Sequence, residues 1–141
     1  IEIYNESLYK KNGISQDFIQ DDISTSRHNV LRGIHGDAST SKLVSCLYGE
    51  FYLVVVNNNP NSKQYKKWQS FNLSDVNRKQ VLIPPMYGNG HLVLSDVCIY
   101  HYKQTTEYNR EGQFTIMWDD PEYNIKWPLK NPILSKRDGG K

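Results

Sequence analysis

The chain has 141 residues, enough for one domain with a single sizeable core. Its 17 Lys and Arg against 15 Asp and Glu leave a formal net charge of +2, too slight to predict a nucleic-acid-binding or membrane surface. There is no signal peptide pattern and no apolar stretch near the roughly 18 residues of a membrane span. Cys46 and Cys98 each lie in an apolar alternating run, which favours free thiols in the cytoplasm over disulfides or a zinc site. Because the sequence starts at Ile1 without Met, we expect an N-terminal segment to be missing from it.

Short alternating segments separated by turn residues predict one all-β domain over 1–141. Near the start, Asn5 can cap a helix over Glu6–Lys11, which Gly13 would close. The first strands are expected at Lys42–Tyr48 and Phe51–Val56, joined by a hairpin turn. Further strands are expected at Lys67–Leu73, Gln80–Ile83, His91–Leu94, Val97–Tyr102 and Phe114–Trp118. Since side chains alternate along a strand, Tyr100 and Tyr102 should share a face that His101 does not. Jelly rolls of this size often pair across a dimer, so we expect a homodimer.

Three groups of residues resemble one enzyme family when they are taken together. They are Val30–His35 followed by Lys42–Val44; Tyr102–Asn109; and Trp118–Pro121 with Ile125–Pro128 and Leu134–Asp138. Their order and separation are similar to those of the dTDP-4-dehydrorhamnose 3,5-epimerase family, from about Gln20 to the C-terminal region. The resemblance implies a cupin-type β jelly roll (double-stranded β-helix) with a few short helices, an epimerase activity, and no metal or other cofactor.

The resemblance also implies a set of catalytic residues whose chemistry suits a 4-keto sugar. The ketone acidifies the two neighbouring C–H bonds, so inversion needs a base on one ring face and an acid on the other. His35 would be the base, because an unperturbed histidine has a pKa of about 6.5. Asp138 would orient His35. Tyr102 would be the acid, and Lys42 would face the forming enolate oxygen.

The substrate-binding residues follow from the same resemblance. Arg32 would hold phosphate or sugar oxygens through its bidentate fork. Gln20 matches a polar contact to the nucleotide base, and Tyr108 matches an aromatic residue at the nucleotide or diphosphate end. Glu2 matches a glutamate near the family's N-terminus. The expected partners are a nucleotide-diphosphate 4-keto sugar and a second copy of the chain, with no nucleic acid and no membrane.

The chain departs from the family pattern near the ketone. The loop 36–41 is three residues shorter, and Asn89 stands where a histidine is expected. Asn89 can still donate to the ketone oxygen but cannot become cationic, and His91 could substitute from the same strand face. These variants resemble epimerases of bacterial capsular heptose synthesis that act on GDP-linked 4-keto-6-deoxy-heptoses. Two alternatives stay open, an epimerase reduced to one carbon and an inactive sugar-binding paralogue.

Two other classes compete with the epimerase. A metal-dependent cupin generally needs two closely spaced histidines, whereas the four histidines here are scattered along the chain. A carbohydrate-binding jelly roll would use Trp68, Trp118, Trp127 and the many tyrosines to stack on sugar rings. The second class gives no reason for a base, a carboxylate, a Lys and a phenol in the family's order.

Overall fold

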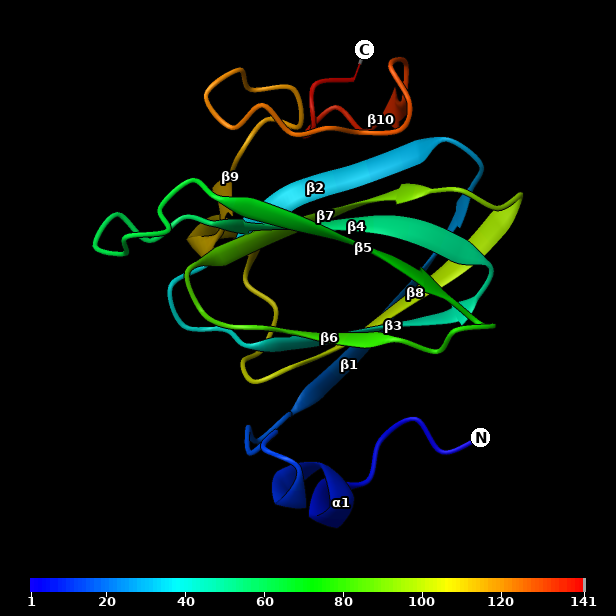
Figure 1. Ribbon diagram of the computed structural model, residues 1–141, viewed down its shortest axis with the longest axis vertical. Helices are drawn as coiled ribbons and strands as arrows, with labels where there is room; N and C mark the ends of the chain where they lie inside the picture. The colour runs from blue at the N-terminus through cyan, green and yellow to red at the C-terminus, as the bar shows by residue number, and fades with distance from the viewer. Residues whose placement is uncertain (141) are drawn as a thin grey trace.

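The computed structural model describes residues 1–140, in which two β-sheets lie face to face (Figure 1). One sheet has the order β1 (Gln20–Arg27), β8 (Val97–Gln104), β3 (Lys42–Tyr48), β6 (Gln80–Ile83). The other has the order β10 (Ile133–Leu134), β2 (Val30–Gly36), β7 (Tyr87–Val93), β4 (Glu50–Asn57), β5 (Trp68–Ser74), and β9 (Phe114–Thr115) also pairs with β2. Among residues 1–140, the β10–β2 pair is the only parallel one. The expected all-β jelly roll is confirmed.

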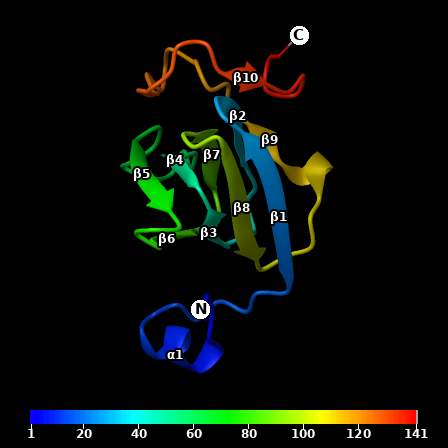
Figure 2. The same cartoon turned by 90° about the vertical axis from the view of Figure 1, so that its right-hand side faces the viewer.

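The elements with clear sequence signals form where they were expected. Helix α1 (Glu6–Lys11) is capped by Asn5, whose Oδ1 accepts a hydrogen bond from the Leu8 amide at 3.0 Å. It lies beyond the four-stranded sheet, at the opposite end of the molecule from the C-terminal segment (Figure 2). Strands β3 and β6 have the predicted bounds, whereas β9 ends at Thr115 instead of Trp118. The chain also contains a 3-10 helix at Arg110–Gly112.

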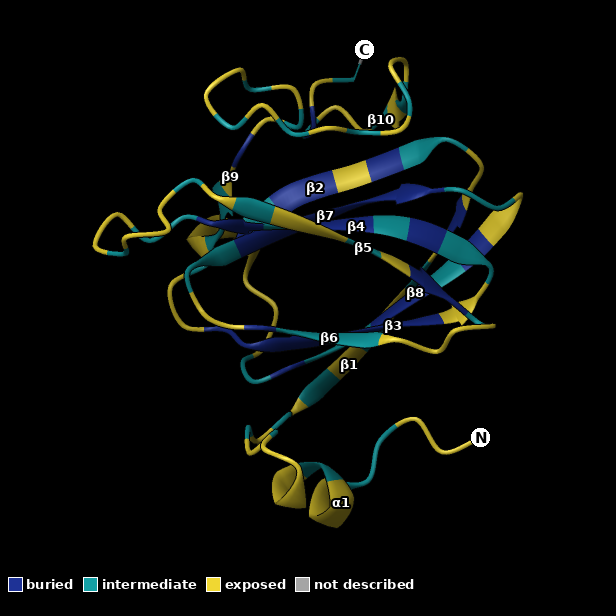
Figure 3. Ribbon diagram, viewed as in Figure 1, coloured by how far each residue is buried: buried dark blue, intermediate teal, exposed yellow. Residues whose placement is uncertain are grey.

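The main core lies between the two sheets. Phe51, Leu53, Leu73 and Val44 are fully buried there, and the buried positions concentrate on the facing strands in Figure 3. Burying one such side chain stabilises the fold by about 1.5–3 kcal/mol. The apolar contacts therefore fix the two sheets against each other, and the side chains at the ends of these strands are held by the same frame.

A second cluster covers the outer face of the larger sheet. Residues 117–140 run across this face, where Trp68 Nε1 donates to the Tyr123 carbonyl at 3.0 Å. Trp127 Nε1 donates to the Trp118 carbonyl at 2.8 Å, and the Tyr52 hydroxyl donates to the Lys126 carbonyl at 2.7 Å. This route returns the end of the chain to β2, which is what brings residue 138 to the site.

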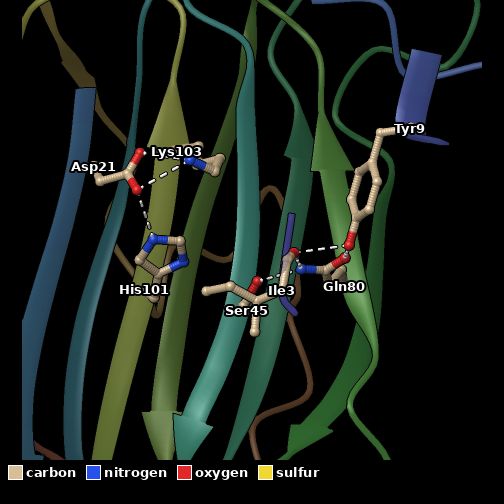
Figure 4. A network of polar contacts seen from close by, with 7 residues as sticks. All are labelled: Ile3, Tyr9, Asp21, Ser45, Gln80, His101 and Lys103. Carbon is tan, nitrogen blue, oxygen red and sulfur yellow. Dashed lines mark hydrogen bonds and ion pairs between the residues drawn. The ribbon is translucent and has the colours of Figure 1, made fainter. Parts of the chain in front are cut away.

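The outer face of the four-stranded sheet carries a polar network (Figure 4). Gln80 Nε2 donates to Ser45 Oγ at 2.8 Å and to the Ile3 carbonyl at 2.9 Å, and the Tyr9 hydroxyl donates to Gln80 Oε1 at 2.6 Å. These bonds hold the N-terminal segment over the sheet. His101 points to this face, 3.4 Å from Asp21, as the alternation on β8 predicted. No helix among residues 1–140 is long and apolar enough to cross a membrane.

Candidate active site

A cavity of about 480 Å³ opens between the two sheets. Its walls come from β1, β3 and β8 on one side and from β2 and β7 on the other. Every residue predicted for the site lines this cavity except Asp138 and Glu2. Because strands from opposite sheets supply the polar side chains, a sugar ring placed between them would meet functional groups on both of its faces.

His35 lies at the end of β2 and is paired with Asp138. Nε2 of His35 is 2.8 Å from Oδ1 of Asp138, an oxygen that is buried and has no other partner among residues 1–140. The predicted contact between two residues far apart in the sequence is therefore made. A carboxylate accepts and does not donate, so Nε2 carries the proton and Nδ1 keeps its lone pair. That lone pair is the basic site of the ring.

Asp138 is held in place by three groups besides the histidine contact. Its Oδ2 accepts from the Gly33 amide and from Ser135 Oγ, both at 3.1 Å. Burial raises the pKa of Asp138, but the hydrogen bonds from His35, Gly33 and Ser135 outweigh it and hold the pKa below its usual range. Gly33 has φ +118, and a Cβ there would lie 2.5 Å from Gly90 Cα. Only glycine allows β2 to approach β7 so closely.

The free nitrogen of His35 faces a residue that the sequence did not single out. Nδ1 lies 3.2 Å from Oγ1 of Thr115, which pairs with His35 in the β2–β9 register. The hydroxyl can donate to the neutral ring and accept from the protonated ring. Thr115 and Asp138 thus hold the imidazole from both sides. Motif matching missed Thr115 because its role comes from a contact across the β2–β9 pair.

Tyr102 lies across the cavity from His35, on β8 of the other sheet. Burial raises its pKa well above the usual range for a phenol, and the nearby Asp22 carboxylate adds to the effect. The hydroxyl therefore stays protonated at neutral pH. Base and phenol are carried by opposing sheets, which matches the opposite-face arrangement that inversion requires.

Lys42 and Asn89 are bonded to each other at the floor of the cavity. Lys42 Nζ donates to Asn89 Oδ1 at 3.1 Å, although the lysine is only 8% exposed. Burial lowers the pKa of Lys42, Asp37 opposes that shift, and Arg137 adds to it. Asn89 pairs with His35 in the register of β2 and β7. The predicted ketone-facing groups are thus adjacent to the predicted base.

The residues predicted to bind the nucleotide end of the substrate line the same cavity. Arg32 Nε donates to Ser26 Oγ at 2.9 Å, which leaves the two terminal amino groups of its guanidinium available for an anion. Gln20 accepts from the Tyr108 amide at 2.9 Å and donates to Asp22 Oδ2 at 2.7 Å. Gln20 therefore positions the chain that carries Tyr108.

Glu2 and His91 have surroundings unlike those of the other predicted residues. Glu2 lines a second cavity of about 440 Å³ beside Gln80, on the outer face of the four-stranded sheet. Its expected contact at the site is therefore not made within one chain, because the N-terminal segment folds back over its own sheet. His91 lines the site cavity but is buried, and its Nε2 has no partner among residues 1–140. Its ring stacks on Tyr100 with centroids 4.1 Å apart.

A β jelly roll with a His–Asp pair on one wall and a phenol and a lysine on the other has the groups of an acid–base enzyme. Comparison with known proteins gives the family. The model of the dTDP-4-dehydrorhamnose 3,5-epimerase family matches residues 1–141. A relative of that name from Methanothermobacter thermautotrophicus is 40% identical over 143 residues, covering 98% of this chain and 77% of the relative.

Solved structures agree. An epimerase from Legionella pneumophila, in complex with dTDP-4-keto-L-rhamnose, has a TM-score of 0.91 at 36% identity and covers 97% of this chain and 75% of its own. One from Bacillus anthracis, with TDP and pyrophosphate bound, has a TM-score of 0.93 at 31% identity, covering 97% and 81%. The chain belongs to the dTDP-4-dehydrorhamnose 3,5-epimerase family. The resemblance drawn from the motifs, and the expectation of an epimerase, are confirmed.

Proposed function

We propose that this protein inverts carbon 3, carbon 5 or both in a 4-keto-6-deoxy sugar linked to a nucleoside diphosphate, in deoxysugar synthesis for a surface polysaccharide. The observation that carries the proposal is the pairing of His35 with Asp138 across from Tyr102. The family membership supports the substrate class, since relatives in this family are named for 4-keto-6-deoxy sugars.

The reaction follows from the positions of these groups. With the substrate bound, Nδ1 of His35 exchanges its contact with Thr115 for the carbon next to the ketone and takes the proton from that carbon. The electron pair of that C–H bond moves into an enolate. Asp138 stabilises the imidazolium that forms, by accepting from Nε2. Tyr102 then gives its proton to the same carbon from the opposite ring face. Exchange with water afterwards removes the proton from the His35 imidazolium and returns one to the Tyr102 phenolate, so both groups are reset and no net proton is gained or lost. The configuration is inverted because the proton leaves on one side and returns on the other.

The remaining residues bind the substrate. Arg32 holds the diphosphate through its free guanidinium groups, and Gln20 with Tyr108 positions the nucleoside. The ammonium of Lys42 stabilises the negative oxygen of the enolate. Every step of this mechanism uses only side chains of this protein, the substrate and water. We infer that the enzyme works in the cytoplasm, which is consistent with its buried free thiols at Cys46 and Cys98.

We also propose that the protein is a homodimer that pairs through the outer face of the four-stranded sheet. Ile23, Leu47 and Val97 are exposed on this face, at 62%, 38% and 40%. Sedimentation should give twice the chain mass, and Ile23→Asp should shift it toward the monomer. A monomeric wild type would contradict this part of the proposal.

The decisive experiment is incubation in deuterium oxide with dTDP- and GDP-linked 4-keto-6-deoxy sugars, including a heptose, followed by NMR and mass spectrometry. Deuterium at carbons 3 and 5 would establish a double epimerase. Deuterium at only one of these carbons would establish an epimerase that inverts a single carbon. Tight binding without exchange for any of these sugars would contradict the proposal in favour of a sugar-binding paralogue.

A further inference from the structure

Three side chains form a hydrogen-bonded row on the floor of the cavity. Lys42 Nζ donates to Asn89 Oδ1 at 3.1 Å, and Asn89 Nδ2 donates to the Tyr100 hydroxyl oxygen at 2.9 Å. The orientation of the amide is fixed, because an ammonium can only donate and must therefore face the amide oxygen. The Tyr100 oxygen thus accepts, and its own proton is free for another acceptor.

The proton of Tyr100 has no acceptor among residues 1–140, although the side chain is only 5% exposed and lines the cavity. The His91 ring stacks on the Tyr100 ring, with centroids 4.1 Å apart and planes 8° apart. The Phe51 ring also packs against it, with a distance of 5.1 Å between the centroids. Burial raises the pKa of Tyr100 far above the usual range for a phenol. It is a rigid, neutral donor with an unused proton, and Asn89 links it to the Lys42 ammonium.

We propose that Tyr100 is a further catalytic residue, whose hydroxyl donates a hydrogen bond to the sugar's keto oxygen and, more strongly, to the enolate oxygen. This inference rests on the proposed function. Fixed donors aimed at an oxygen that gains negative charge stabilise the transition state most, because they need no reorganisation. Tyr100 keeps its proton throughout. The C–H proton moves to His35, and the electron pair is shared by carbon and the oxygen that Lys42 and Tyr100 contact.

This role also accounts for the departure at position 89. The family pattern has a histidine there, which can donate to the ketone as a cation, whereas Asn89 cannot carry charge. In this chain the amide of Asn89 is already bonded on both sides, accepting from Lys42 and donating to Tyr100, and so aligns these two side chains. The lost donor is thus replaced from β8 in the opposing sheet.

Tyr100 and Tyr102 can be separated by one experiment, because only Tyr102 transfers a proton to carbon. Tyr100→Phe should slow deuterium exchange by about 10²–10³-fold at every carbon the wild type exchanges, as removal of one oxyanion donor does. Tyr102→Phe should keep exchange through His35 on one face but lose inversion. Tyr65→Phe, in an exposed loop, is the matched control and should match the wild type. An exchange rate in Tyr100→Phe equal to that of the wild type would overturn the proposal.

A second measurement does not need turnover. In a His35→Asn background, calorimetry should show that adding Tyr100→Phe weakens binding of the 4-keto nucleotide sugar by roughly 3- to 10-fold, the worth of one hydrogen bond. Binding of the nucleoside diphosphate alone should not change. Equal affinities for the keto sugar with and without Tyr100 would overturn the role.

A rescue variant guards against a merely structural effect. The double variant Asn89→His/Tyr100→Phe restores a donor at position 89 and should recover part of the exchange rate lost in Tyr100→Phe. The melting temperatures of the single and double variants are compared to check that both are folded. Absence of recovery in a folded double variant counts against the proposal. If the wild type neither exchanges nor binds any 4-keto sugar, the proposed function fails first. If the wild type is active and Tyr100→Phe is equally active, only the Tyr100 inference fails.

Discussion

The space between the two sheets has an apolar end and a polar end, and the same three strands run through both. The inner face changes from apolar to polar along each: Cys46 to Lys42 on β3, Val93 to Asn89 on β7, and Cys98 to Tyr102 on β8. At one end Phe51 and Leu53 are fully buried between the sheets. At the other end the side chains leave a cavity of about 480 Å³.

The comparison shows how the fold combines stability with chemistry. His35, Lys42 and Tyr102 lie on strands whose other ends are fixed by close packing, so their positions are set by rigid elements. Asp138 and Tyr108 lie outside the strands, in a turn of the C-terminal segment and in the chain after β8. Changes at the polar end should therefore affect catalysis with little loss of stability, and changes at the apolar end should do the reverse. Four substitutions test this division, in order of the expected effect.

The largest effect is expected for the base. His35→Asn should reduce deuterium exchange by about 10²–10⁴-fold, the usual contribution of a positioned general base, while the melting temperature stays near that of the wild type. Exchange is followed by NMR. His28→Asn, at an exposed histidine outside the cavity, is the control and should keep full activity. An active His35→Asn enzyme would show that the base lies elsewhere.

The apolar end should respond in stability. Phe51→Ala empties a fully buried position and should lower the free energy of unfolding by about 3–5 kcal/mol in urea titrations. Val76→Ala, at a residue that is 89% exposed, should change it little. If Phe51→Ala were as stable as the wild type, the proposed division between the two ends would be wrong.

The partner of the base should have an intermediate effect. Asp138→Asn keeps the shape but replaces a charged acceptor, so kcat should fall by about 10- to 100-fold, matching roughly 1.5–3 kcal/mol for a hydrogen bond to a charged group. Asp119→Asn, on the exposed part of the same C-terminal segment, serves as control. A change in KM alone, with kcat preserved, would argue against an orienting role for Asp138.

The smallest effect concerns His91, at the boundary between the two ends. Burial, with the nearby Arg32, lowers its pKa from 6.5 to about 3, against the opposing effect of Asp138. Between these values the unfolded chain binds a proton that the folded chain does not, so stability falls as the pH is lowered from 6.5 toward 3. Compared with His91→Phe, the wild type should lose up to about 1.4 kcal/mol more per pH unit.

Denaturant titrations at several pH values would measure this difference. His28→Asn should keep the wild-type pH dependence, because it leaves His91 in place. Parallel stability curves for the wild type and His91→Phe would mean that His91 takes up its proton without cost in the folded state.

Sequence patterns located some strands well and missed others for a clear reason. β3 and β6 were predicted because their apolar residues alternate with turn signals on both sides. β1 was not predicted, since Gln20–Arg27 holds one apolar side chain, Ile23, and that residue points outward. β1 is a strand because its backbone pairs with β8 in continuous register. That pairing is a long-range contact that no local pattern contains.

The candidate site shows the same division. The family motifs predicted His35, Lys42 and Tyr102, and these residues do line one cavity. Thr115 and Tyr100 were assigned no role, because each acquires its importance from a neighbour across a strand pair or a sheet. Glu2 was assigned a place at the site that the fold of one chain does not give it.

The sequence by itself determined the family, the period-2 faces of the central strands, and the chemical groups available for acid–base work. These properties are local, because a strand alternates its side chains whatever it packs against. The tertiary structure alone decided that Asp138 reaches His35, that His35 and Tyr102 line one cavity from opposing sheets, and that Asn89 joins Lys42 to Tyr100. Each of these contacts joins different strands or segments, so its existence depends on how the two sheets and the C-terminal segment pack.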